Sequence, residues 1–441
     1  MEGAVDKRWR ASTLRNGMVR WLPLAGVLII ALLVRVGSMT QAAHLGDLEH
    51  FAHWMRVIDQ EGLLRFYEPE FRFSRIDRTY PALTTLTFGV LVQLSGIPPD
   101  PQFVAQRSDY ISLMKLFPVA FELALIVVVY AWLTSRPVWR WLIPLLLALA
   151  PGLAATSAWW GQLEALPMLF LVLSLIALNR DRPLWAWIMF ALALLTKQQA
   201  AALTPLLVLV TLRRYGFRTL LLDGGAAVLI FSLVTLPFVF GSGLDNALYP
   251  YLSATTDAFP SMTNNAFNLW FALASINKGS TVFFGDPTLY DGVAAIGGLT
   301  FKGVGYVLYG GYVLLISAFI WRQGRQRREF LWAAALFLGF FMLPTQAHER
   351  YLYPGVVLTL IAIAQDRRVW WAALCLINTY TYNVYAAVLH PLLDNPLFAV
   401  NSFAVPVALV NTLLFLYVTY TVIVPPRGDQ TSVSPAAAVA Q

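Results

Sequence analysis

The stretch HLGDLEHFAHW (44–54) follows directly after an apolar run and carries two acidic side chains, Asp47 and Glu49. A carboxylate in such a place can accept a proton from an incoming hydroxyl, and general-base catalysis contributes about 10²–10⁴-fold to a rate. Asp47 is therefore a candidate catalytic base, and Glu49 a candidate to orient the base or the acceptor. Two alternatives stay open: Asp47 as a helix N-cap, and Glu49 as a side chain that faces water.

The same stretch holds His44, His50 and His53. They resemble a metal site only weakly, because no cysteine or further ligand is spaced to match. No metal is expected here.

Four further blocks place polar residues beside apolar runs, where they are costly and usually line a site or cavity. The candidate residues are Asp77, Arg78 and Tyr80 in RIDRTYPALT; Gln162 and Glu164 in SAWWGQLEALP; Lys197 and Gln198 in LLTKQQAAALTP; and His348, Glu349, Arg350 and Tyr351 in PTQAHERYLYP. A group of Lys, His and Arg can hold a phosphate and stabilise the negative charge of a leaving group. With a base, and an apolar route for a lipid tail, these residues indicate sugar transfer from a lipid phosphate.

Each block also has a structural interpretation. Glu164 and Lys197 could form an ion pair that only stabilises the fold, and the 348–350 segment could be an ordinary hydrated turn. Trp159 and Trp160 are typical of anchors at a membrane interface.

The composition indicates a polytopic all-α membrane protein. The 441 residues are 58% hydrophobic and 12% charged, and the mean hydropathy is +0.62, whereas soluble domains carry about 25% charged residues. Apolar runs near the length of about 20 residues that a span needs predict 11 to 13 transmembrane helices within residues 21–424. An amphipathic helix is expected in the first external loop, within FAHWMRVIDQEGLLRFY (51–67).

Basic clusters between the apolar runs favour the cytoplasm. They predict a cytoplasmic segment 1–20, external loops 40–80 and 241–302, and a disordered tail 425–441. One conflict remains: if the runs at 80–96 and 110–133 both cross, Arg136 and Arg140 lie on the wrong side.

Several functional classes are excluded or disfavoured. The net charge of +7 comes from short clusters between spans, and no nucleic-acid motif is present, so nucleic acid is not an expected partner. A phosphate-binding P-loop and a GxSxG serine elbow are absent. The single cysteine, Cys375, excludes an internal disulfide.

In this order the blocks are similar to those of the membrane glycosyltransferases of the GT-C class, which use polyprenyl-phosphate sugars. The resemblance rests on GDLEHFAHW (46–54), TYPALT (79–84), SAWWGQLEALPMLF (157–170), LALLTKQQA (192–200), NNAFNLW (264–270) and HERYLYP (348–354). The first loop resembles the dolichyl-phosphate-glucose glucosyltransferases of asparagine-linked glycosylation, and the later blocks resemble bacterial mannosyltransferase-type relatives. Where the glucosyltransferases have an acidic residue before YP and a second proline after it, this chain has Thr79 and Ala82, with Asp77 two residues earlier.

The resemblance implies a GT-C fold, Asp47 as base, and His348 and Arg350 near the donor phosphate. It further implies transfer of mannose or glucose by single displacement with inversion and without a cofactor. The expected partners are a polyprenyl-phosphate sugar, membrane lipids, and a glycan, glycolipid or protein acceptor. The expected place is the bacterial plasma membrane, with the site facing outward. The alternatives are a transporter or flippase of lipid-linked sugars, and a glycan ligase or polymerase.

Overall fold

Long apolar runs fold as helices here because a helix satisfies its own backbone hydrogen bonds inside a membrane. The computed structural model describes residues 2–72, 78–96, 108–252, 259–279, 281, 286–389 and 400–426. The chain is 80% helical with almost no strands, which confirms the predicted all-α membrane class. The predicted disordered tail, 425–441, lies outside the described residues except for its first two positions, 425 and 426.

The first half of the chain contains α1 (Glu2–Met39), α2 (Leu45–Gln60), α3 (Ala82–Ser95), α4 (Ser108–Trp132), α5 (Pro137–Leu149), α6 (Pro151–Ala154), a π-helical turn η5 (Ala155–Trp160), α7 (Ala165–Asn179), α8 (Pro183–Thr196), a 3-10 turn η6 (Gln198–Leu203), α9 (Thr204–Tyr215) and α10 (Phe217–Ser242). The second half contains α11 (Leu244–Ala247), α12 (Tyr249–Leu252), α13 (Leu269–Lys278), β1 (Ala294–Ile296), β2 (Leu299–Thr300), α14 (Phe301–Gln323), α15 (Glu329–Met342), a 3-10 turn η8 (Glu349–Leu352), α16 (Tyr353–Ala362), α17 (Trp370–Leu389) and α18 (Val400–Ile423).

Five helices in the described part are long and apolar enough to cross a membrane alone: Trp21–Met39, Ser108–Ser135, Phe217–Ser242, Phe301–Gln323 and Phe403–Ile423. The pair Pro137–Leu149 and Pro151–Trp160, bent by 53°, makes a sixth if it is one span. The remaining apolar helices are shorter, so the count of 11 to 13 spans stays a prediction.

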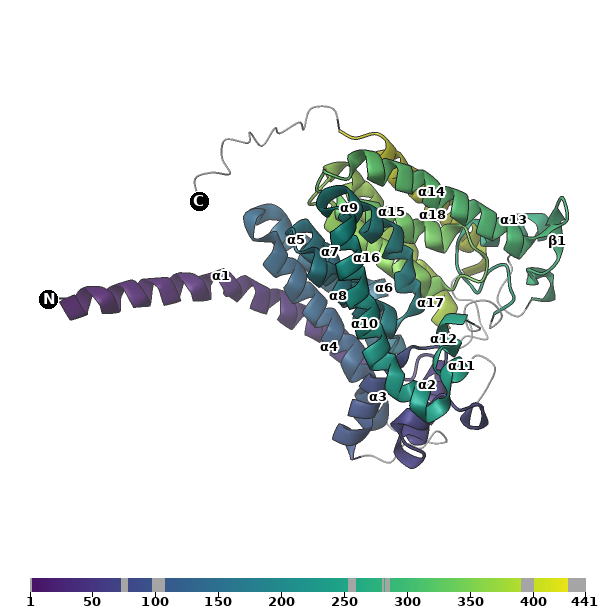
Figure 1. Cartoon of the computed structure of the whole chain (residues 1–441), viewed down its shortest axis with the longest axis horizontal. Coiled ribbons are helices and arrows are strands. Elements are labelled where there is room, and N and C mark those ends of the chain that lie inside the picture. Colours follow the sequence, from purple (N-terminus) through teal and green to yellow (C-terminus); the bar gives the residue numbers. More distant parts are fainter. Residues whose placement is uncertain are drawn as a thin grey trace.

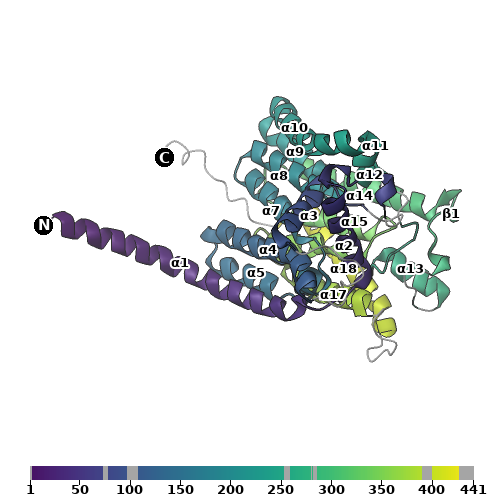
Figure 2. The same ribbon diagram turned by 90° about the horizontal axis from the view of Figure 1, so that it is seen from below.

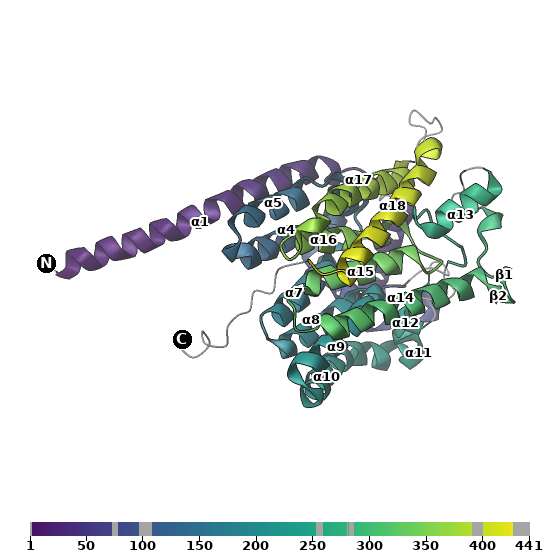
Figure 3. The ribbon, with the colours of Figure 1, turned by 90° about the horizontal axis from the view of Figure 1, so that it is seen from above.

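The core is centred on α15 and α16. Every residue of α16 is buried, and so are all residues of α15 except Phe340. The other helices surround this pair, while the N-terminal part of α1 projects away from the bundle (Figures 1 and 3). A helix that is apolar on all sides can be buried among other helices or face lipid, and here neighbouring helices cover both α15 and α16.

Helix α4 runs antiparallel to α1. Near its start, Lys115 donates a hydrogen bond to the carbonyl of Ser38 at the end of α1. Near the other end of α4, the ring of Tyr130 lies 5.8 Å from that of Trp21, and Arg140 stacks on both rings. The end of α1 and the start of α4 therefore share one face, so α3 between them makes no net crossing. Arg136 then lies on the same side of the membrane as the start of the apolar part of α1, which follows the basic segment 1–20. The conflict over the side of Arg136 is thereby removed.

We expect single cysteines to report this arrangement through a membrane-impermeant maleimide, in a Cys375→Ser background. Glu61→Cys and Gln93→Cys should react from one side of the membrane, and Arg136→Cys only from the other. All three positions are exposed. Labelling of Gln93→Cys from the Arg136 side would show that α3 crosses.

Helix α2 and a short β-hairpin lie on the face of the molecule where α1 ends. Helix α2 confirms an amphipathic helix in the first loop, although it spans Leu45–Gln60 and ends before the last residues of the predicted stretch 51–67. Its apolar side packs on α3. The second loop ends in a hairpin of β1 and β2, paired Ala294 with Thr300. Its turn, Gly297–Gly298, has positive φ at both residues, as a two-residue hairpin turn of type I′ requires. The hairpin lies at the end of the molecule opposite the free part of α1 (Figures 1 and 2).

Candidate active site

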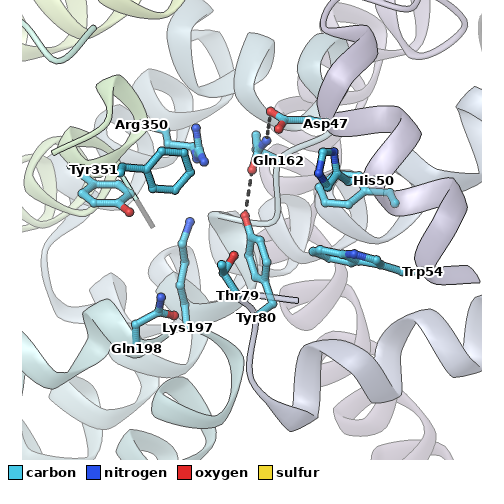
Figure 4. Close-up of a pocket in the computed structure, with 12 residues that line it drawn as sticks. Asp47, His50, Trp54, Thr79, Tyr80, Gln162, Lys197, Gln198, Arg350 and Tyr351 are labelled. Carbon is cyan, nitrogen blue, oxygen red and sulfur yellow. Dashed lines mark hydrogen bonds between the residues drawn. The ribbon is translucent and has the colours of Figure 1, made fainter. Parts of the chain in front are cut away.

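A pocket on this face collects side chains from distant parts of the sequence (Figure 4). The space it encloses, with its open mouth, is about 620 Å³. Its lining residues are Asp47, His50, Phe51, Trp54, Thr79, Tyr80, Gln162, Lys197, Gln198, Phe259, Arg350 and Tyr351. The first loop, the segment after the π-helical turn, η6, the second loop and η8 thus all contribute.

Asp47 lies in the first turn of α2 with one carboxylate oxygen held in place. Its Oδ2 accepts hydrogen bonds of 2.7 Å from Trp160 Nε1 and 2.7 Å from Gln162 Nε2. The N-cap of α2 is His44, whose Nδ1 accepts from the backbone N–H of Asp47. The N-cap alternative for Asp47 is therefore wrong. Its Oδ1 accepts no hydrogen bond from the described residues, so this oxygen is available to a substrate.

Gln162 connects Asp47 to the opposite wall. Its Oε1 accepts from the hydroxyl of Tyr80 at 3.0 Å, while its amide nitrogen donates to Asp47. Figure 4 shows this chain of three side chains across the pocket. Because Gln162 is 1% exposed, its two hydrogen bonds are shielded from water and fix the carboxylate in one orientation.

Two cations face Asp47 across the pocket, and their carboxylate partners are buried behind them. Lys197 forms an ion pair with Glu164, and Arg350 Nη1 lies 3.0 Å from Glu349 Oε1. Neither Glu164 nor Glu349 lines the pocket. The positive ends of both pairs are thus presented to a ligand, an arrangement suited to a phosphate.

Arg350 has a second contact that fixes its place. Its guanidinium stacks over the ring of Trp160, 5.4 Å from the centroid, a cation–π contact. Burial lowers the pKa of Arg350, but Glu349, Tyr80, Asp47 and Tyr351 together more than offset this and hold the pKa well above its usual value. Arg350 therefore stays charged at every working pH.

His348 does not line the pocket. Its ring packs edge-on against Phe259, which does, at 4.4 Å. Burial first, and then Arg350, Lys197 and His44, hold the pKa of His348 well below its ordinary value. The imidazole is therefore neutral at neutral pH. Its Nε2 has no hydrogen-bond partner among the described residues.

This low pKa predicts an acid-sensitive fold. Because the unfolded imidazole takes up a proton near pH 6.5 and the folded one does not, stability is complete above about pH 6.5 and falls below it, by up to about 1.4 kcal/mol per pH unit. Thermal unfolding in detergent should show a lower midpoint at pH 5 than at pH 7. His348→Gln should lose part of this dependence, and an equal dependence in wild type and variant would contradict the prediction.

Besides Glu164, His348 and Glu349, two further predicted residues, Glu49 and Arg78, do not line the pocket. Glu49 is two positions from Asp47 on α2, hence about 200° around the helix, and is not a lining residue. Arg78 is buried, with a positive φ, and donates to the carbonyl of Glu68 at 2.5 Å. Asp77 lies outside the described residues.

Several residues at the site were missed from the sequence, among them Trp160, which binds Asp47 although it does not line the pocket. Trp160 is not an interface anchor, because it is 2% exposed and binds Asp47. His50 is three positions after Asp47, and this spacing places both on one helix face, a signal that was available. Trp54, Thr79 and Phe259 carried no comparable signal. His50 and His53 each contact a different backbone carbonyl, of Gly46 and Phe71.

An apolar groove continues from the pocket between α9, α14 and α15. Its space is about 1390 Å³. The pocket and the groove share Gln198, Phe259 and Tyr351. Further along, the groove is lined mainly by Ala202, Pro205, Tyr306, Tyr309, Val313 and Phe340. A hydrocarbon chain in this groove would be removed from water, and each buried CH₂ would contribute about 0.8 kcal/mol of favourable binding free energy.

The fold and the site define a helical membrane protein whose pocket opposes a carboxylate to two cations at the mouth of an apolar groove. The model of glycosyltransferase family 87 matches residues 79–345, more than half of the chain, and the chain belongs to this family. This is consistent with a membrane glycosyltransferase of the GT-C type and supports the predicted class of enzyme. No curated protein matches the chain.

The matched stretch includes Tyr80, Gln162, Lys197 and Gln198. It ends before Arg350 and begins after Asp47. The place of these two residues in the pocket therefore comes from the structure and not from the family match.

Proposed function

We propose that this protein transfers a hexose, mannose or glucose, from a polyprenyl-phosphate donor to an acceptor hydroxyl. The observation that carries the proposal is the geometry of Asp47, with one oxygen held by Trp160 and Gln162 and the other open to the pocket. A carboxylate fixed in this way is prepared to accept a proton from a substrate.

The donor would lie across the junction of pocket and groove. Its polyprenyl chain would occupy the apolar groove, and its phosphate would meet Lys197 and Arg350. The sugar would then fill the pocket between these cations and Asp47. Family membership supports glycosyl transfer, and the volume and mainly apolar lining of the groove support a lipid-linked donor.

The reaction would be one displacement. Asp47 takes the proton from the acceptor hydroxyl as its oxygen forms a bond to the anomeric carbon. The bond from that carbon to the phosphate oxygen breaks, and its electron pair stays on the polyprenyl phosphate. Lys197 and Arg350 stabilise the added charge. Because attack and departure occur on opposite faces of the carbon, the configuration is inverted.

The proposed setting is the non-cytoplasmic face of a bacterial plasma membrane. The pocket is on the face opposite to Arg136 and Arg140, and basic residues favour the cytoplasmic side. The acceptor, a glycan, glycolipid or protein, would enter from the open mouth of the pocket.

The test uses the purified protein in lipid nanodiscs. Labelled polyprenyl-phosphate mannose, polyprenyl-phosphate glucose and an oligosaccharide on a lipid diphosphate are each supplied with a membrane lipid extract as acceptor. We expect transfer from one monosaccharide donor. Transfer from the oligosaccharide lipid alone would indicate a ligase or polymerase, and donor binding without transfer to any acceptor would indicate a transporter or flippase.

A further inference from the structure

Lys115 on α4 is a buried cation that the proposed reaction does not use. Its side chain is fully buried. The ammonium donates to three backbone carbonyls: Ser38 at 3.4 Å, Trp159 at 2.5 Å, and Gln41. None of these partners is a carboxylate, so Lys115 is not half of an ion pair.

Two of the three carbonyls belong to helix ends. Ser38 lies in the last turn of α1, and Trp159 is the residue before the last of the π-helical segment η5. The last carbonyls of a helix have no partner within it and carry partial negative charge. A lysine can satisfy them, and Lys115 does so for two helices at once.

Both helix ends lead directly into the candidate active site. Three residues after Gln41, His44 caps α2, and Asp47 follows in the first turn. On the other side, Trp160 follows Trp159, and Gln162 is two residues further. Lys115 therefore joins two segments: one leads to Asp47, and the other leads to Trp160 and Gln162, which donate hydrogen bonds to Asp47.

The stem of Lys115 adds a steric restraint. It packs against Gly161, where a Cβ would lie 3.1 Å from Lys115 Cγ. Gly161 has a φ of +91° and turns the chain from Trp160 to Gln162. The lysine thus covers the turn that directs both hydrogen-bond donors.

We propose that Lys115 is a positioning residue, which joins the end of α1 to the π-helical turn and so keeps Trp160 and Gln162 on the carboxylate of Asp47. The inference rests on the proposed function, since it assigns Asp47 as the base. Lys115 itself touches no substrate, and its effect reaches the reaction only through these two donors.

The first test is Lys115→Met, whose unbranched side chain is one atom shorter and has no hydrogen-bond donor. Hydrogen bonds to a charged group are worth enough that kcat should fall by about 10–100-fold, while KM for the donor changes by less than about twofold. A carboxylate that loses two donors is protonated more easily, so the acid limb of the pH profile of kcat/KM should move to higher pH. Lys115→Gln, whose amide can still donate twice, should restore part of the rate.

The other charged and titratable groups around Asp47 are not substituted in this variant, so the shift reports the two lost hydrogen bonds. They are His44 and His50 on or beside α2, Tyr80, Lys197, and Glu349 and Arg350 on η8.

Two comparison variants separate positioning from general destabilisation. Gln162→Leu removes one donor directly, and its effect should be less than additive with that of Lys115→Met. Asn179→Leu breaks a partly buried hydrogen bond to Glu329 at the opposite end of the bundle, so it should lower stability without moving the acid limb. A Lys115→Met variant that loses activity only in proportion to its folded fraction, as Asn179→Leu does, would overturn the inference.

Hydrogen exchange gives a readout that does not depend on activity. In Lys115→Met, exchange should rise together in residues 38–48 and 155–163 and stay unchanged near Asn179. Unchanged exchange in those two segments would overturn the inference. If the wild type transfers no sugar, the proposed function fails, and this measurement still decides whether Lys115 joins the two segments.

Discussion

Asp47→Asn should lower the rate of sugar transfer by about 10²–10⁴-fold and leave donor binding close to that of the wild type. The amide has the same shape as the carboxylate and can still accept hydrogen bonds from Trp160 and Gln162 through its oxygen. It cannot take a proton from an acceptor hydroxyl. The loss should therefore appear in kcat and not in the affinity for the donor.

The measurement compares transfer and donor binding of the wild type and Asp47→Asn in nanodiscs. Asp59→Asn is the matched control, because it makes the same change on the exposed side of the same helix. It should behave like the wild type. Transfer that survives in Asp47→Asn would mean that another carboxylate, such as Asp77 or Glu49, is the base.

Lys197→Met should have two separable effects, because Lys197 is both half of a buried ion pair and part of the pocket wall. The side chains of Lys197 and Glu164 are 6% and 1% exposed. Removing one partner of such a pair costs about 3–5 kcal/mol in stability, since the other charge is left buried. Arg350 Nε remains 3.7 Å from Glu164, so we expect a loss near 3 kcal/mol together with weaker donor binding.

The double variant Lys197→Met/Glu164→Gln distinguishes the two effects. Because it leaves no unpaired charge, most of the stability should return, as measured by the thermal unfolding midpoint in detergent. Donor binding should stay weak, because the cation that meets the phosphate is still missing. Donor affinity that returns together with stability would show that the pair only supports the fold.

The sequence alone determined the class of the fold. Low charge and repeated apolar runs are incompatible with a water-exposed chain, and a lipid environment admits few structures other than helices. It also indicated the amphipathic helix α2 and the polar blocks that meet in the pocket, since charged residues beside membrane spans are costly unless they line a site. It did not decide whether 80–96 crosses, because hydropathy and length do not record which helix ends lie together.

Only the tertiary structure decided how the site is built. Asp47 and Glu49 look equivalent in the sequence, and the helical direction of α2 alone puts one in the pocket and the other outside it. From the sequence, Trp160 is typical of an anchor at a membrane interface. In the structure, the π-helical turn directs its indole N–H to Asp47. Lys115 was one lysine in an apolar run, and its contacts lie 44, 74 and 77 positions away. Hydropathy and spacing describe neighbours along the chain, whereas hydrogen bonds of this kind depend on how distant helix ends pack in space.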